Sequence, residues 1–242
     1  MLILSLDSST KGCSAALHQD GALLSACDLH TDRSSSSMLT TLIQSTVQNA
    51  GFALHDLDAI AVAKGPGSYT GLRVAVSTAK GLCYALDKPL IGINTLAAMA
   101  RQLSTFYEDN ASTQGYLLCP MLDARRMEVY ATVFDTRLQT ILPTQAVVVQ
   151  ADSFGTLLEK YPIVFFGDGA AKCQPVLGTH PHAHFLSEPL HPSARTVGTL
   201  ATEAFLRAEF EDVVTFEPYY LKDFMGTQPR SLPTDSAQAV DA

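Results

Sequence analysis

Short apolar runs and amphipathic stretches alternate along the first hundred residues of the chain. Residues 2–6, 13–17 and 21–29 are short apolar runs bounded by turn residues, a pattern that predicts three β-strands. In residues 32–50 the apolar positions recur at the spacing of one helix face, and Gly51 then supplies the residue that commonly ends a helix. The pattern continues with a predicted strand at 59–63, helix at 69–86, strand at 90–93 and helix at 95–103.

A polar stretch at residues 107–115 separates these elements from a second set. Strands are predicted at 116–121, 128–135, 146–149 and 163–166, and helices at 153–160 and 194–209. We therefore expect an α/β protein of two lobes, residues 1–105 and 106–225, with the helix near 194–209 packing back on the first lobe. Residues 226–242 have little apolar surface to bury and are predicted to form a disordered tail.

Composition limits the classes of function. The 242 residues carry 24 acidic and 16 basic side chains, a net charge of −8, which argues against the chain gripping nucleic acid by itself. The five cysteines are scattered without a C-x-x-C pair, as in proteins that keep reduced thiols. The apolar start of the chain is too short for a signal peptide and no apolar run approaches 18 residues, so we expect a cytoplasmic protein with no membrane contact.

The turn between the predicted strand 59–63 and the predicted helix 69–86 has the composition of an anion site. Gly65, Pro66 and Gly67 form the turn, and Ser68 follows as a residue that commonly caps a helix. Such a turn directs free backbone N–H groups toward a bound phosphate. The same residues also make an ordinary helix start, and the sequence leaves both interpretations open.

A second polar turn lies between the first two predicted strands. Asp7, Ser9 and Thr10 have side chains suited to phosphate and magnesium, but a turn in which they bond local amides is the simpler interpretation and the one we favour. The two turns together define a candidate, degenerate phosphate site: Asp7, Ser9, Thr10, Gly65, Gly67 and Ser68.

Five motifs, in this order along the chain, resemble the bacterial TsaB (YeaZ) family. They are residues 3–10 (ILSLDSST), 65–73 (GPGSYTGLR), 79–82 (AKGL), 123–130 (DARRMEVY) and 218–222 (PYYLK). The resemblance covers nearly the whole chain. It implies the actin-like ATPase fold shared with sugar kinases and Hsp70, in which each of two lobes holds a mixed β-sheet flanked by helices. Active ATPases of this fold carry a glycine where Ser9 stands here.

The same resemblance implies a function and a set of partners. TsaB proteins support the synthesis of N6-threonylcarbamoyladenosine at position 37 of tRNA as partners of the catalytic paralogue TsaD, and the ATPase TsaE joins the complex. For this chain it implies a TsaD-like and a TsaE-like partner, and contact with tRNA only through the complex. It also implies no tightly bound cofactor, with ATP or ADP held at the junction with the partner.

The catalytic paralogue binds a metal through two histidines four residues apart on the helix corresponding to residues 95–103. Thr95 and Met99 stand at those positions here, and neither replaces an imidazole ligand. The resemblance therefore implies a member without metal chemistry and without the peptidase activity once attributed to the wider family. We expect no catalytic residues and no metal site.

The predicted helix 69–86 is apolar over much of its girth, which predicts that it buries two faces. We expect one of them, together with helix 32–50, to contact a partner or, in the chain alone, a second copy. The predicted interface residues are Met38, Leu42, Leu72, Val76, Ala79 and Cys83. The alternative is that both helices only cover the sheet of their own lobe.

Three further features carry weaker hypotheses. Asp123, Arg125 and Glu128 suggest catalysis, but an exposed ladder of ion pairs explains them equally well. Gly167-Asp168-Gly169 is interpreted as a turn, because the acid would repel phosphate, and the alternating histidines at 180, 182 and 184 suggest adventitious metal binding at most. The alternative functions are an independent ATP hydrolase or small-molecule kinase using Asp7 and the Gly65 turn, and a metallopeptidase-like hydrolase.

Overall fold

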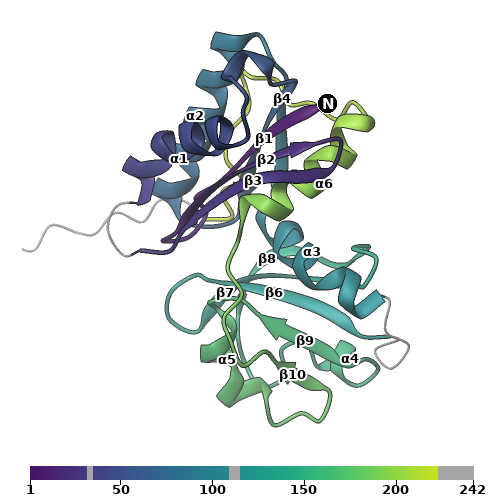
Figure 1. Cartoon of the computed structure of the whole chain (residues 1–242). Helices are drawn as coiled ribbons and strands as arrows, with labels where there is room; N and C mark the ends of the chain where they lie inside the picture. The colour runs from purple at the N-terminus through teal and green to yellow at the C-terminus, as the bar shows by residue number, and fades with distance from the viewer. Residues whose placement is uncertain (32–34, 109–114, 223–242) are drawn as a thin grey trace, which may run out of the picture.

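Two five-stranded β-sheets, one in each lobe, form the framework of the computed structural model, which describes residues 1–31, 35–108 and 115–222 (Figure 1). In the first sheet the strands lie in the order β3-β2-β1-β4-β5, and in the second in the order β10-β9-β6-β7-β8. The strands are β1 (Leu2–Asp7), β2 (Cys13–Gln19), β3 (Ala22–Leu29), β4 (Ala59–Gly65), β5 (Leu90–Asn94), β6 (Leu117–Asp123), β7 (Glu128–Asp135), β8 (Thr140–Val148), β9 (Ile163–Phe166) and β10 (Ala183–Phe185).

The two sheets have the same topology. In the first, β1 pairs antiparallel with β2 and parallel with β4, β2 continues antiparallel to β3, and β4 continues parallel to β5. In the second, β6 takes the place of β1, with β7 and β8 antiparallel on one side and β9 and β10 parallel on the other. This repeated mixed sheet confirms the predicted α/β fold of the actin-like type.

Helices cover both faces of the first sheet and separate it from the second. They are α1 (Ser35–Asn49), α2 (Tyr69–Leu86), α3 (Thr95–Glu108), α4 (Gly155–Leu158), α5 (Ala170–Leu177) and α6 (Ala194–Leu206), with a short 3-10 turn at Leu54–Asp56. Helices α1 and α2 cover one face of the first sheet, and α6 covers its other face against β1 and β2 (Figure 1). Helix α3 follows β5 but packs mainly on β6, so α3 and α6 fill the space between the lobes.

The predicted elements agree with the observed ones where the apolar pattern is strong. Helix α2 and strands β7 and β9 have the predicted bounds. Strand β8 begins at Thr140, six residues before the predicted start, because its pairing with β7 carries it through Pro143. Helix α5 and strand β10 were not predicted: α5 is eight residues long with a proline inside, and β10 has three residues.

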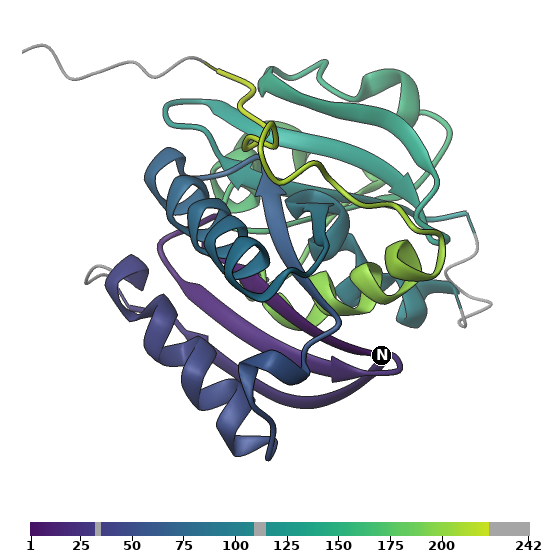
Figure 2. The same cartoon turned by 90° about the horizontal axis from the view of Figure 1, so that it is seen from above.

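The C-terminal strap, residues 210–222, runs from the end of α6 along the first lobe and reaches the second (Figure 2). Its Phe216 enters the core of the first lobe, and the Lys80 ammonium donates to the carbonyls of Val214 (3.2 Å) and Phe216 (2.9 Å). At its end, Lys222 forms an ion pair with Glu128 of β7. The strap therefore links the lobes. The predicted tail at 226–242 lies outside the described residues.

All five cysteines carry free thiols, as their scattered spacing predicts. Burial raises the pKa of Cys13 to about 11 and that of Cys83 to about 12, which keeps both thiols protonated at neutral pH. Among the described residues, no helix combines the length and the apolar character needed to cross a bilayer.

Candidate functional site

The structure brings the two predicted phosphate turns into direct contact. Asp7 ends β1, and its Oδ1 accepts hydrogen bonds from the backbone N–H of Ser9 (2.8 Å) and from the Ser9 hydroxyl (2.7 Å). The carbonyl of Ser9 in turn accepts from the backbone N–H of Ser68 (2.6 Å), at the start of α2. An amide that an anion would need is therefore bonded within the chain.

Glycines allow this contact. A Cβ on Gly67 would collide with the carbonyl oxygen of Ser9, and a Cβ on Gly71 would collide with that of Ser8. The Ser8 hydroxyl also donates to the carbonyl of Gly71 (2.7 Å), and both serines are fully buried. The β1–β2 turn thus fills the space that a phosphate would occupy above the start of α2.

The C-terminal strap closes the opposite side of this junction. The backbone N–H of Tyr219 donates to the carbonyl of Lys64 (2.7 Å), and a Cβ on Gly65, whose φ is +116°, would lie 2.7 Å from the carbonyl oxygen of Tyr219. Next to this junction, the ring of Tyr220 stacks on that of Tyr69 with centroids 4.7 Å apart. The residues of the predicted phosphate site do not fit a bound phosphate, and the packing favours the plain turn.

Burial in this junction disfavours the charged form of Asp7. Its side chain is 2% exposed, and Oδ2 has no hydrogen-bond partner among the described residues. Burial raises the pKa of Asp7 to about 6, against the opposing effect of the two hydrogen bonds from Ser9. At neutral pH the folded protein therefore holds a buried carboxylate that is only half satisfied.

Thr10 lies instead at a polar cleft of about 390 Å³ between the lobes. The cleft is lined by Thr10, Lys11, Gly12, His30, Thr31, Asp123, Asp168 and His191. The rings of His30 and His191 lie 5.3 Å apart. Desolvation raises the pKa of Asp168, whose side chain accepts a hydrogen bond from the N–H of Asp123 (3.0 Å). Asp168 thus secures the end of β6, in keeping with its interpretation as a turn residue.

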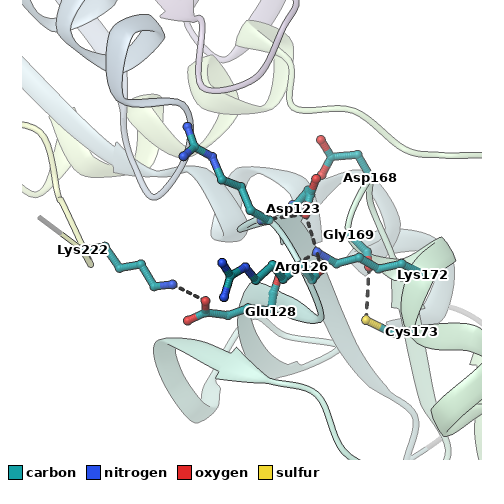
Figure 3. A network of polar contacts seen from close by, with 9 residues as sticks. Asp123, Arg126, Glu128, Asp168, Gly169, Lys172, Cys173 and Lys222 are labelled. Carbon is teal, nitrogen blue, oxygen red and sulfur yellow. Dashed lines mark hydrogen bonds and ion pairs between the residues drawn. The ribbon is translucent and has the colours of Figure 1, made fainter. Parts of the chain in front are cut away.

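The β6–β7 hairpin is held by a network of charged side chains (Figure 3). The Lys172 ammonium of α5 donates to the carbonyls of Arg126 (2.7 Å) and Glu128 (2.7 Å) and pairs with the Asp123 carboxylate. Of the two interpretations left open for these residues, ion pairing is observed at both acids, but Asp123 and Glu128 pair with lysines from α5 and from the strap rather than with Arg125. Neither lysine could be assigned from the sequence, because 49 residues separate Lys172 from Asp123.

The predicted partner-interface residues need a correction. Leu42, Leu72, Val76, Ala79 and Cys83 are buried inside the chain, most of them in the core shared with β1 and β4. They cannot contact a partner without opening the first lobe, because the sheet already covers them. Met38, at 42% exposed, is the one member of the predicted set that lies on the surface.

The outward face of α1 and α2 is made mostly by residues outside the predicted set. It consists of Met38, Thr40, Thr41, Gln44, Gln48 and Asn49 of α1, and Thr70, Arg73, Ser77, Gly81, Tyr84 and Ala85 of α2. Tyr84 is 86% exposed, and among the described residues no atom outside the local helix backbone lies within 4 Å of a Cβ built on Gly81. Arg73 is the sole charged side chain of this α1–α2 face, in a chain whose net charge is −8.

The positions of the paralogue's metal ligands lie in the core between the lobes. Thr95 and Met99 are completely buried, and Met99 packs in the cluster that contains Leu118 and Phe166. His182 of the histidine run lies with Nδ1 2.7 Å from the carbonyl of Leu158. Within the described ranges, no three His, Cys, Asp or Glu side chains are grouped so as to hold a metal.

Comparison with known sequences points to one family. Residues 29–225 match the family model described as TsaD, tRNA N6-adenosine threonylcarbamoyltransferase. The chain is 34% identical over 134 residues to the tRNA threonylcarbamoyladenosine biosynthesis protein TsaB of Escherichia coli (strain K12), which is 54% of this chain and 53% of that protein. It is 31% identical over 187 residues to the TsaB protein of Bacillus subtilis (strain 168), covering 74% of this chain and 78% of that protein.

Comparison with solved structures agrees. A crystal structure from Pseudomonas aeruginosa, described as an uncharacterized protein with similarity to peptidase YEAZ, superposes with a TM-score of 0.74 at 26% identity. The superposition covers 91% of this chain and 99% of that chain. The chain thus spans almost the whole of this structure, but only about half the length of the Escherichia coli relative.

Proposed function

Because the chain belongs to the TsaB (YeaZ) family, we propose that it is a non-catalytic subunit of the system that makes N6-threonylcarbamoyladenosine on tRNA. In this proposal it binds a TsaD-like threonylcarbamoyltransferase, and the α1–α2 face is the docking surface. The names of the relatives support the pathway in this proposal. The exposed residues of this chain support the way in which it binds its partner.

The near absence of charge on the α1–α2 face, where Arg73 is the one charged side chain, carries the proposal. The cores of protein interfaces are depleted in charged residues and enriched in Tyr and Met, both of which this face exposes. The small side chains of Ser77, Gly81 and Ala85 lie along one side of α2 and allow a partner helix to approach closely. We therefore propose that the predicted docking surface lies on the same two helices, α1 and α2, but is formed by their exposed residues and not by the buried ones.

The sealed turn and the apolar core at Thr95 and Met99 support a role without catalysis. The first leaves no room for a phosphate beside Asp7, and the second places a methionine where a metal ligand would be required. We therefore assign no catalytic step to these residues. ATP or ADP at the junction with the partner, a TsaE-like third subunit and a homodimer of the isolated chain stay predictions.

Co-purification tests the docking surface. We expect Gly81→Arg to weaken binding to a TsaD-like subunit at least tenfold, because a second long cation would enter a closely packed interface at the position where the helix has no side chain. The chain itself should stay folded, since the Cβ position is open. Thr105→Arg, on an exposed position of α3, is the matched control and should bind normally. Normal binding by a folded Gly81→Arg chain would show that the partner docks elsewhere.

A further inference from the structure

We propose that the tip of the β6–β7 hairpin, Arg125 and Arg126, binds phosphate groups of the tRNA backbone when the chain is in its complex. The inference rests on the proposed function, which brings tRNA to the chain. It adds a direct contact with RNA, made by two residues to which no role has been assigned above.

The tip has a costly backbone conformation that the structure fixes from several sides. Arg125 and Arg126 have φ angles of +69° and +45°, in the left-handed region that few non-glycine residues adopt. Asp123 Oδ1 accepts the N–H of Arg125 (2.9 Å), and the Lys172 ammonium binds the carbonyl of Arg126. The two arginines are therefore presented on a rigid support, which reduces the entropy lost on binding.

The guanidinium groups at the tip are available. Both arginines are exposed, and among the described residues neither forms an ion pair. The neighbouring carboxylates of Asp123 and Glu128 are each neutralised by a lysine. In Figure 3 the side chain of Arg126 extends to the side of the hairpin opposite Lys172. A planar guanidinium suits bidentate binding of phosphate, and two adjacent ones suit a polyanion.

The charges around the tip favour RNA over a protein partner. Asp123, Glu128, Lys172 and Lys222 surround it, whereas the core of a protein interface is depleted in such residues. With Asp168, which accepts the N–H of Asp123, three carboxylates stand beside four cations: Arg125, Arg126, Lys172 and Lys222. The chain as a whole has a net charge of −8. Two phosphate contacts do not hold tRNA alone, which agrees with the charge argument from composition. They add to the affinity that the partner supplies.

The salt dependence of tRNA binding tests this inference on the complex of the chain with a TsaD-like subunit. The dissociation constant of unmodified tRNA is measured at several KCl concentrations for the wild type and for Arg125→Ala/Arg126→Ala. We expect binding to weaken on the order of tenfold, and the slope of log K against log salt to become shallower by about 1.5 to 2. Arg137→Ala, at an exposed turn that follows the other end of β7, is the matched control.

Three other outcomes would overturn either RNA binding by the hairpin tip or the proposed function of the chain. If the complex forms and binds tRNA, and the double variant has the wild-type affinity and slope, the tip does not touch RNA. If the double variant instead binds the TsaD-like subunit less well and the assembled complex binds tRNA normally, the tip recognises carboxylates on the protein partner. Failure of the wild-type chain to form the complex contradicts the proposed function itself.

Discussion

The β1–β2 and β6–β7 hairpins hold the same place in their lobes and begin with the same turn chemistry. Each first strand ends in an aspartate whose Oδ1 accepts the backbone N–H two residues later: Asp7 from Ser9 at 2.8 Å, and Asp123 from Arg125 at 2.9 Å. The parallel extends to the following loops, where glycines pack against the hairpin backbone in both lobes. The two hairpins are thus alike at the aspartate that begins each turn and at the glycines packed beside it.

Their surroundings make them opposites. The first tip, with Ser8 and Ser9, is buried against α2, and Oδ2 of its aspartate has no hydrogen-bond partner among the described residues. The second tip, with Arg125 and Arg126, is exposed, and its aspartate pairs with Lys172. Distant elements thus decide which hairpin is a structural joint and which is open to a ligand. We therefore infer function from what packs on a turn rather than from its motif.

The largest expected effect comes from breaking the buried joint. Gly71→Ala places a Cβ against the carbonyl of Ser8, and both backbones must move. We expect the free energy of unfolding, measured by urea denaturation, to fall by about 2 to 4 kcal/mol. Gly81→Ala in the same helix meets no atom and should raise stability by about 0.5 to 1 kcal/mol. Equal effects of the two changes would contradict the tight joint.

The next effect, which depends on pH, comes from the two aspartates. Because the pKa of Asp7 is raised to about 6 in the folded state, the folded chain holds this proton where the unfolded chain has lost it. The wild type therefore loses stability as pH rises from about 4 to about 6, by about 3 kcal/mol, and the loss persists at higher pH. Asp7→Asn lacks this loss, so its stability relative to wild type should increase by that amount between pH 4 and pH 7.5.

Asp123→Asn is the matched change in the exposed hairpin. Its side chain is half exposed, so we expect a change in the free energy of unfolding within about 1 kcal/mol at both pH values. Urea denaturation of the wild type and both variants at the two pH values gives the comparison. If the free energy of unfolding of Asp7→Asn depended on pH as that of the wild type does, Asp7 would not be the buried carboxylate described above. The difference between the two hairpins would then not include it.

The sequence predicts most of the fold, because its strong apolar patterns have local causes. The bounds of α2 follow from Ser68, whose hydroxyl accepts the N–H of Gly71, and from Asp87, which takes the left-handed conformation at its end. The direction in which α2 faces does not follow. Its two apolar sides are alike in sequence, and only the position of the sheet determines that Val76 lies inside and Tyr84 outside.

The candidate sites are less predictable from the sequence, because distant segments of the chain determine what packs on each motif. The motif at the Gly65 turn suggests open amides, but the close contact of Ser9 and Tyr219 with the turn depends on chain segments far away in sequence. Likewise, Lys172 and Lys222 hold the β6–β7 hairpin across 49 and 94 residues. Local composition carries no signal for such contacts.

Reconstitution tests the central claim of a non-catalytic subunit most directly. Formation of N6-threonylcarbamoyladenosine on tRNA is measured with a TsaD-like and a TsaE-like protein, with and without this chain, beside ATP hydrolysis by the chain alone. We expect that product forms only when the chain is present, at an undiminished rate with Asp7→Asn, and that the chain alone hydrolyses no ATP. Hydrolysis by the chain alone at a rate that Asp7→Asn abolishes would contradict it and favour an independent ATPase.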